Sequence, residues 1–518
     1  MILLKITSLK IKRSLLPIFF CNCLLFILLS HLSGCNTNRK NQDLRESEKL
    51  VQKYCTNCHL APSPLLLDKK TWTDGVLPAM ASQLGIEVLE GNIYLHTKQS
   101  VISSQDWTKL ISYYKELAPD TLIQKSPLRP AEKSWFTFDL KKPLPDTKEI
   151  AATIMTAIDS DNQLIYTSST NNPSLDQWDK KFQKSSLLTL KSAAVDIAFG
   201  KERKVITSMG GMRAMDYTIG EIMLLSESGR KVTSGQLSLN YIRPIQTRPA
   251  DLNKDGLTDY IVCSFGHTKG GLFWEKQLPD KTFQKLAIRE VPGATQTETG
   301  DFNGDGWPDV VALFAHGDEG IWLFLNDKKG GFVTRNIVRF PPVFGSSSFQ
   351  LADMNKDGKV DIIYTAGDNS DYSRILKPYH GLYVFLNRGN FRFTKPDFYP
   401  VNGCTKAMAA DFDLDGDMDI AMISFFTDLK NNPEQKFMIF KNTFNSDQKR
   451  LFLNPVYIPI EKNGRWISMD VNDYDGDGDK DIVLGNFSKG FLNQQDFKAD
   501  WDTHTPFIVL ENHIKTLH

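Results

Sequence analysis

The chain has 518 residues, with 61 Lys and Arg against 61 Asp and Glu, so its formal net charge is zero. No basic surplus indicates a nucleic-acid partner, and no acidic tail indicates a solvating segment. Hydrophobic residues at 41% and charged residues at 24% are typical of a soluble globular protein, and the length suffices for a large domain plus a smaller one.

Residues 1–34 have the pattern of a bacterial export signal. Basic residues precede an apolar run that starts at Leu15 and ends in Leu32-Ser33-Gly34-Cys35. This ending resembles the bacterial lipobox, which implies cleavage before Cys35 and lipidation of that residue. An uncleaved membrane anchor is the alternative, because the run is about long enough to span a bilayer. We expect a tether over residues 35–42 and a lipid-anchored lipoprotein of the bacterial cell envelope, facing the periplasm or the cell surface.

The segment Cys55-Thr56-Asn57-Cys58-His59 has the spacing of a c-type haem attachment motif. Two thiols at this spacing add across the haem vinyl groups, and the adjacent imidazole then reaches the iron. A redox disulfide would need a βαβ setting and a zinc site would need a second ligand pair, and neither is visible nearby. The sequence therefore predicts haem c on Cys55 and Cys58, with His59 as proximal ligand. The two cysteines in later strand-like segments, Cys263 and Cys404, are expected to be buried free thiols.

Two predicted helices flank this motif. Residues 43–54 have helix-forming composition, and Ser103-Ser104-Gln105-Asp106 resembles a capping box opening a helix that ends before Pro119. A helix leading into the motif and an aromatic-rich C-terminal helix resemble the small class I cytochromes c. The resemblance covers residues 43–125 and implies a small all-α haem domain.

The resemblance also requires a second axial iron ligand, for which two residues compete. Met80 follows a proline in a loop-like segment that resembles the distal methionine loop of the family, and a thioether ligand would raise the reduction potential. His96 is the rival and would give a lower potential. We predict Met80 as the distal ligand, and we expect Pro62 or Pro64 to offer a carbonyl to Nδ1 of His59.

Five segments repeat the pattern Asp-x-Asp/Asn-x-Asp-Gly-x-x-Asp, with starts 50, 52, 58 and 62 residues apart. Oxygens at positions 1, 3, 5 and 9 can surround one cation, and Gly at position 6 permits a sharp turn. None of the five has the Glu at position 12 that an EF-hand needs. A metal-free hairpin is the alternative, but five copies favour calcium. The predicted calcium ligands are Asp251, Asn253, Asp255, Asp259, Asp301, Asn303, Asp305, Asp309, Asp353, Asn355, Asp357, Asp361, Asp411, Asp413, Asp415, Asp419, Asp473, Asp475, Asp477 and Asp481.

An apolar strand-like segment follows each of these Asp loops, and another recurs later in each unit. The units resemble the FG-GAP or VCBS repeats of integrin-alpha-like β-propellers, in which the loop joins the first two strands of a blade. Two weaker copies near residues 157 and 195 bring the expected total to seven blades, and residues 135–138 are expected to add the outer strand that closes the last blade. The predicted fold is a small all-α cytochrome c-like domain (43–125) followed by an all-β, seven-bladed propeller (126–518).

The propeller resemblance also assigns two faces. The Asp loops would occupy one face, and the turns between second and third strands would occupy an opposite, binding face. That face is expected to carry His267, His316, Asp318, Glu319 and the insertion 367–380. Four residues that precede the loops by three positions are expected to line the central channel: Arg248, Glu298, Gln350 and Asp470. An ordinary solvated role is the alternative for each of them.

These features predict a mono-haem electron-transfer lipoprotein whose calcium-binding propeller docks a partner or ligand. Expected partners are a redox protein or envelope oxidoreductase, the membrane through the lipid anchor, and a glycan or protein on the propeller face, without nucleic acid. Three alternatives stay open: a carbohydrate- or protein-binding module with an accessory haem, an adhesion propeller, and a haem-linked oxidoreductase. No nucleophile and base stand at a distinctive spacing, so we name no catalytic residue and expect an electron carrier rather than a catalyst.

Overall fold

The computed structural model of the chain describes residues 42–90, 92–125, 128, 132–133, 138–200, 202–228, 231–370, 373–444, 451–490 and 497–515. The expected signal peptide 1–34 and Cys35 lie outside the described residues. Within the described part of the chain, no helix is both long enough and apolar enough to cross a bilayer.

The chain divides into two compact units. The smaller contains Trp72–Leu117 and the described residues up to Asn57, and the larger contains Cys58–Thr71 and the chain from Ala118 onward. In the smaller unit residues 42–55 are helical, and the later elements are η2 (Trp72–Val76, a π-helical turn), α3 (Leu77–Gln83), β1 (Ile86–Leu89), β2 (Ile93–His96) and α4 (Ser104–Leu117). The larger unit begins with the short η1 (Pro64–Leu66) and α2 (Lys69–Thr71).

The helix α4 begins and packs as its sequence predicts. Oγ of Ser103 accepts a hydrogen bond from the backbone N–H of Asp106 at 3.1 Å, which satisfies one of the unpaired donors of the first turn. Trp107 and Tyr114 are buried, and the Tyr114 ring lies 4.4 Å from that of Trp72. The expectation of an all-α domain is nevertheless wrong in one respect, because β1 and β2 pair as an antiparallel hairpin.

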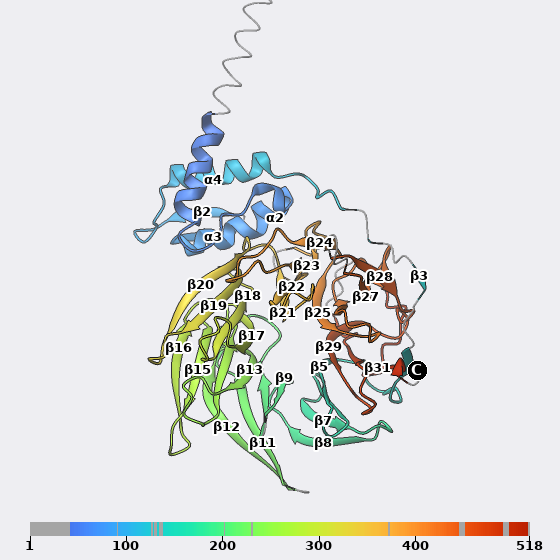
Figure 1. Cartoon of the computed structure of the whole chain (residues 1–518). Helices are drawn as coiled ribbons and strands as arrows, with labels where there is room; N and C mark the ends of the chain where they lie inside the picture. Colours follow the sequence, from blue (N-terminus) through green and yellow to red (C-terminus); the bar gives the residue numbers. More distant parts are fainter. Residues whose placement is uncertain are drawn as a thin grey trace, which may run out of the picture. The chain divides into compact units, whose positions relative to one another are not determined.

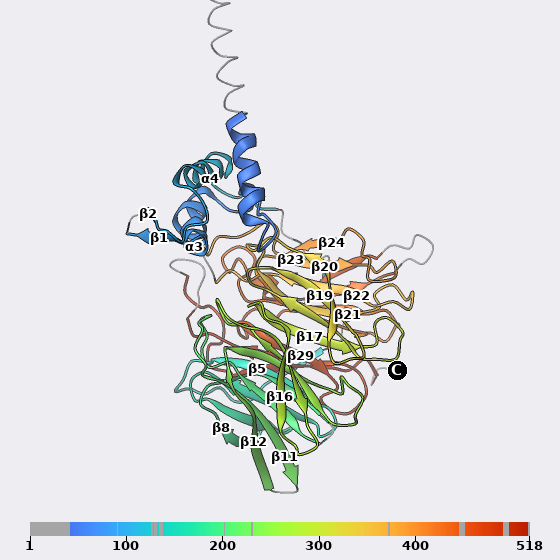
Figure 2. The same ribbon diagram turned by 90° about the vertical axis from the view of Figure 1, so that its left-hand side faces the viewer.

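The larger unit is a β-propeller of seven sheets, arranged in a ring with their first strands innermost (Figure 1). Blade 1 contains β5 (Thr153–Asp159), β6 (Leu164–Ser169), β7 (Ser174–Trp178) and β8 (Lys184–Thr189). Blade 2 contains β9 (Ala194–Phe199), β10 (Lys204–Ser208), β11 (Gly220–Ser228) and β12 (Lys231–Tyr241), of which the last two extend past the neighbouring strands (Figure 2). Blade 3 contains β13 (Pro244–Ala250), β14 (Asp259–Ser264), β15 (Gly271–Gln277) and β16 (Phe283–Arg289).

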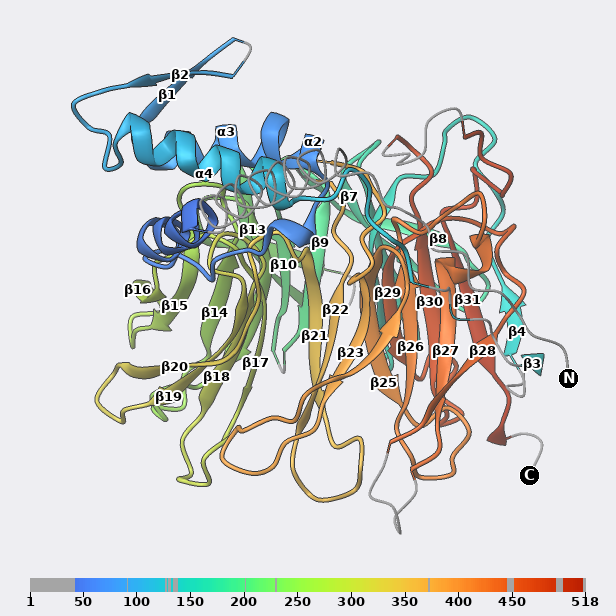
Figure 3. The same ribbon diagram turned by 90° about the horizontal axis from the view of Figure 1, so that it is seen from above.

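The remaining four blades repeat this antiparallel order, and Figure 3 shows their strands side by side. Blade 4 contains β17 (Ala294–Gly300), β18 (Asp309–Phe314), β19 (Gly320–Asn326) and β20 (Phe332–Arg339). Blade 5 contains β21 (Ser346–Ala352), β22 (Asp361–Ala366), β23 (Gly381–Phe385) and β24 (Asp397–Pro400). Blade 6 contains β25 (Cys404–Ala410), β26 (Asp419–Ser424), the 3-10 turn η3 (Pro433–Lys436), β27 (Phe437–Asn442) and β28 (Leu453–Tyr457), with β3 (Glu132–Lys133) added in parallel to β28. Blade 7 contains β29 (Trp466–Asn472), β30 (Asp481–Asn486), β31 (Phe507–Asn512) and β4 (Phe138–Lys141).

Two kinds of contact close the ring. The first strand of every blade contacts the first strand of the next, including β29 against β5. The outer strand of blade 7 comes from the opposite end of the propeller sequence, because β4 pairs with β31. The prediction of a closing strand from residues 135–138 is therefore confirmed at Phe138, and residues 135–137 lie outside the described part of the chain.

The core of the propeller lies between the sheets. All six residues of the second strand are buried in each of β14, β18, β22, β26 and β30, because a blade between two others presents both faces of its middle strands to apolar neighbours. Cys263 on β14 and Cys404 on β25 are buried thiols outside any disulfide, as predicted. The hydrophobic runs that follow the Asp loops are thus core strands.

Candidate functional site

Each of the five Asp loops joins the first and second strands of its blade, in blades 3 to 7. The glycine at position 6 has a left-handed backbone in all five, with φ between +78° and +93° at Gly256, Gly306, Gly358, Gly416 and Gly478, which a residue with a side chain rarely adopts. Position 4 is also left-handed, with φ between +57° and +84°. The sequence pattern identified the first of these turns but not the second.

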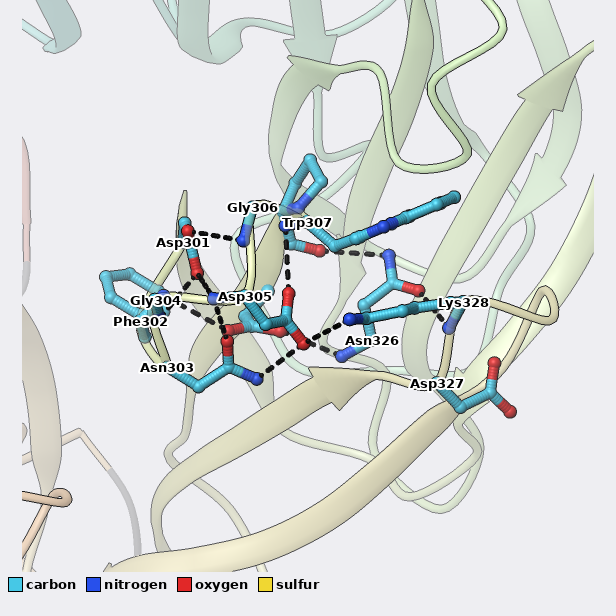
Figure 4. Close-up of polar contacts among 12 residues, drawn as sticks. Asp301, Phe302, Asn303, Gly304, Asp305, Gly306, Trp307, Asn326, Asp327 and Lys328 are labelled. Carbon is cyan, nitrogen blue, oxygen red and sulfur yellow. Dashed lines mark hydrogen bonds and ion pairs between the residues drawn. The ribbon is translucent and has the colours of Figure 1, made fainter.

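The blade 4 loop illustrates how the loop folds on itself (Figure 4). Asp301 accepts hydrogen bonds from the backbone N–H groups of Gly304, Asp305 and Gly306, at 2.8, 3.0 and 2.7 Å. Asp305 accepts from the backbone of Trp307 at 2.9 Å and from the amide of Asn303 at 3.0 Å. These bonds hold the side chains of positions 1, 3 and 5 on the inside of one turn.

The aspartate at position 9 has a structural role that the sequence pattern did not reveal. Its carboxylate is buried in all five loops and accepts two backbone hydrogen bonds. One comes from position 2 of its own loop. The other comes from the last residue of the third strand or, in blade 5, from the residue two positions beyond its end. The donor pairs are Leu252 and Gln277 for Asp259, Phe302 and Asn326 for Asp309, Met354 and Asn387 for Asp361, Phe412 and Asn442 for Asp419, and Tyr474 and Asn512 for Asp481.

Burial dominates the electrostatics of these aspartates. Desolvation raises the pKa of Asp361 to about 6, of Asp481 to about 7 and of Asp419 to about 8, against the opposing effect of the two backbone donors. It also raises the pKa of Asp259 and Asp309. Neighbouring loop carboxylates push in the same direction, so each loop concentrates negative charge that a bound cation would neutralise.

In the last two loops the structure brings predicted ligands close together. Asp411, Asp413 and Asp419 in blade 6 each place a carboxylate oxygen within 4.8 Å of the others, as do Asp473, Asp475 and Asp481 in blade 7. The position 5 aspartate is not part of either triad. In blade 6 the ammonium group of Lys441 contacts Asp413 and lies 3.5 Å from Asp415, so this loop already holds one positive charge.

An asparagine at the end of the third strand links neighbouring blades. The side-chain amide of Asn326 donates to the carbonyl of Leu252 at 2.8 Å, and Asn512 donates to Phe412 at 2.8 Å. Asn442 makes the equivalent bond from blade 6 to blade 5. The repeated sequence of an apolar residue, any residue and Asn at the end of this strand is the signal by which these residues could have been found.

The segment predicted to attach haem, residues 55–59, begins at the end of the first helix. Cys55 is half-buried and Cys58 exposed, and no disulfide joins them. His59 is buried, and its Nδ1 lies 3.0 Å from the carbonyl of Leu60. The expected carbonyl from Pro62 or Pro64 is therefore replaced by that of Leu60, because the chain turns immediately after the histidine. Burial lowers the pKa of His59, which favours the neutral imidazole that binds metals.

The two candidates for the distal iron ligand lie on different elements of the smaller unit. Met80 is half-buried within α3, so the expected loop-like setting is wrong: Pro78 stands in the first turn of a helix, where proline is tolerated. His96 ends β2, and its buried Nδ1 has no hydrogen-bond partner among the described residues. These positions do not decide which of the two residues would bind the iron.

The four residues expected to line the channel lie on the innermost strands and also join adjacent blades. Arg248 forms a double hydrogen bond with Asp196, a partner absent from the prediction, at 2.7 and 3.0 Å. The other three side chains each accept a hydrogen bond from a backbone N–H on the neighbouring blade. The distances are 3.0 Å for Glu298, 2.7 Å for Gln350 and 2.7 Å for Asp470. Hydrogen bonds from polar side chains on the innermost strands therefore connect adjacent blades.

Glu298→Gln is expected to stabilise the protein at pH 8 by about 1 to 3 kcal/mol and to have little effect near pH 4.5. Burial raises the pKa of Glu298 to about 7 from its usual 4.5. The folded chain thus binds more protons than the unfolded chain between these values, and stability falls as pH rises through that window. Gln350 accepts the equivalent backbone hydrogen bond from the next blade, so a glutamine at position 298 can accept it as well. Chemical denaturation at both pH values checks the prediction, and Gln350→Glu should produce the opposite change.

The residues expected on the binding face, His267, His316, Asp318 and Glu319, lie in turns between second and third strands. Their surroundings differ. The rings of His267 and His316 lie 5.4 Å apart. Asp318 is held by Arg289 and Arg339, each at 2.7 Å, and Glu319 is buried. In blade 3 this face also contains a cavity of about 400 Å³ that mixes apolar and charged side chains, among them Phe273, Lys269, Lys285 and Glu290.

Comparisons with known proteins agree with the repeat architecture. A family model described as an FG-GAP-like repeat matches residues 251–312 and 301–364, which contain the Asp loops of blades 3, 4 and 5. The chain is 29% identical to mouse cartilage acidic protein 1 over 191 residues, covering 35% of this chain and 28% of the relative. It is 29% identical to the human protein of the same name over 159 residues, covering 29% and 22%. The chain thus spans about a quarter of the length of these curated relatives. From the matches and the seven sheets together, we conclude that the chain contains FG-GAP-like repeats within a seven-bladed β-propeller.

Proposed function

We propose that this protein is a mono-haem c-type electron carrier of the bacterial envelope, in which a calcium-binding propeller docks a partner. The observation that carries the proposal is the segment Cys55-Thr56-Asn57-Cys58-His59, which has the residue types and spacing of covalent haem attachment. Haem bound there would supply one-electron chemistry between Fe(II) and Fe(III). The resemblance of Leu32-Ser33-Gly34-Cys35 to a lipobox supports attachment of the protein to a membrane.

The residues of the motif fit a haem. Neither thiol forms a disulfide, and covalent attachment of haem would use both as thioethers. Nδ1 of His59 is engaged by the carbonyl of Leu60, which orients the ring and directs Nε2 to an axial ligand role. The lowered pKa of His59 supports the deprotonated nitrogen that iron requires.

Met80→Ala is expected to lower the reduction potential of the haem protein by about 0.1 V or more, because a thioether ligand raises the potential. His96→Ala should leave the potential unchanged and serves as the matched control. A spectroelectrochemical titration of the three proteins checks the prediction. A shift in His96→Ala with none in Met80→Ala would reverse the assignment.

The Asp loops fit calcium. Their oxygens are hard ligands of the kind calcium prefers, and the triads of blades 6 and 7 are already close. Oδ1 of Asp411 and Oδ2 of Asp477 are buried without a hydrogen-bond partner among the described residues. A buried carboxylate oxygen without a donor is costly, and a cation would relieve that cost. Residues at positions 1, 3, 5 and 9 would hold it.

A second candidate function is ligand or protein binding by the propeller, with the haem as an accessory. The cavity in blade 3 favours it, because a concave site with Lys269, Lys285 and Glu290 among apolar side chains suits a small polar ligand. The Cys55→Ser/Cys58→Ser protein separates the two functions. A binding partner identified with the haem protein should still bind this variant, whereas reduction of or by that partner should be lost; retained electron exchange without haem would contradict the electron-carrier proposal.

A further inference from the structure

The loops of blades 6 and 7 share a feature that lies outside the repeated ligand pattern. Each has a fifth aspartate at position 7, Asp417 in blade 6 and Asp479 in blade 7, where the other loops have Leu257, Trp307 and Lys359. The two residues occupy the same place in homologous loops. Their surroundings differ, and the difference indicates what each does.

Asp417 is neutralised by a neighbouring blade. Its carboxylate lies 2.7 Å from the ammonium group of Lys356, which comes from the loop of blade 5. The lysine side chain is 53% exposed, so the pair lies at the surface of the loop. Asp417 therefore has a counterion within the protein.

Asp479 forms no ion pair with any of the residues that the structure describes. The residue is fully buried, and its Oδ1 has no hydrogen-bond partner among the described residues. Its Oδ2 accepts a long bond of 3.4 Å from the backbone N–H of Lys515. The ammonium group of that lysine donates instead to the backbone carbonyl of Asp477 at 3.1 Å.

A second carboxylate with an unpartnered oxygen lies near Asp479. The side chains of Asp479 and Asp477 lie within hydrogen-bonding range of each other, and Oδ2 of Asp477 is also buried without a donor. Oδ1 of Asp477 is occupied by the backbone N–H of Asp479 at 3.1 Å. Two carboxylates in this arrangement repel unless a positive charge lies between them. The triad of Asp473, Asp475 and Asp481 in the same loop increases that repulsion.

We infer that Asp479 is a divalent-cation ligand, acting with Asp477 in the loop of blade 7. The inference rests on the proposed calcium binding of the loops and adds a ligand that the repeat pattern does not contain. The loop of blade 7 then offers five carboxylates to a cation, and calcium affinity rises with the number of charged ligands. Blade 7 is accordingly the tightest calcium site of the propeller.

Calcium titration of the purified chain by isothermal calorimetry tests the inference, with Asp479→Asn and Asp417→Asn as the matched pair. Asp479→Asn is expected to lose one bound calcium or to weaken the tightest site on the order of tenfold, whereas Asp417→Asn should match the wild type. Equal binding by both variants and the wild type would overturn the inference while leaving the proposed calcium loops intact. A wild-type chain that binds no calcium would overturn both.

The melting temperature distinguishes a ligand from a structural residue. In chelator, Asp479→Asn should melt at or above the wild-type temperature, because the substitution removes repulsion between unpartnered carboxylates. In excess calcium, its gain in melting temperature should be smaller than that of the wild type. An equal loss of stability with and without calcium would show that Asp479 only supports the fold, and would overturn the inference.

Discussion

Removing calcium from the protein is expected to lower its melting temperature by more than about 10 °C. A ligand that binds only the folded state stabilises it by about 2.7 kcal/mol per site when its free concentration is about 100 times Kd. Occupied loops in five blades would together contribute on the order of 10 kcal/mol. Chelation would also leave the buried carboxylates of Asp419 and Asp481 beside other negative charges.

Differential scanning calorimetry in calcium and in excess chelator measures this effect. Adding calcium back should restore the original curve, and magnesium should restore less because it demands tighter, octahedral coordination. Identical melting curves in calcium and in chelator would contradict occupied loops and would favour metal-free hairpins.

Asp419→Ala is expected to destabilise the protein by about 2 to 6 kcal/mol, even in chelator, because two buried backbone donors each lose their acceptor at about 1 to 3 kcal/mol. Those donors are the N–H groups of Phe412 and Asn442. The substitution thus loosens the loop from the third strand of its blade, independently of any cation. Urea denaturation in chelator measures the loss.

Asp411→Asn provides the control for this experiment. Asn at position 1 can still accept the bond from Gly416 that Asp411 accepts at 2.9 Å, so its cost should be small in chelator and appear mainly in calcium. An Asp419→Ala protein that unfolds at the wild-type urea concentration in chelator would refute the structural role of position 9.

The propeller could be predicted from local patterns. A glycine at position 6 that must be left-handed, such as Gly306, fixes where each loop turns, and the apolar run after it can only be a buried strand. The five loops, together with the two weaker copies near residues 157 and 195, then give the blade count. The closing strand at Phe138 followed from the same logic, because a ring needs an outer strand for its last blade.

Other features could not be predicted because they depend on contacts distant in sequence. The second donor to Asp309 is Asn326, 17 residues away, and Asp196 meets Arg248 across 52 residues. Met80 misled the prediction for a different reason: a proline at the start of a helix and a proline in a loop look alike in sequence. The hairpin ending at His96 is short and half-exposed, so its hydrophobic pattern is weak.

The mass of the intact chain shows whether haem is covalently attached to this protein. The protein should be produced with a cytochrome c maturation system, and its mass and pyridine haemochrome spectrum measured. We expect one haem per chain, attached to the peptide that contains Cys55 and Cys58. The haem should be absent from the Cys55→Ser/Cys58→Ser variant, which should retain a folded propeller. An unmodified mass with two free thiols in this peptide would contradict the account.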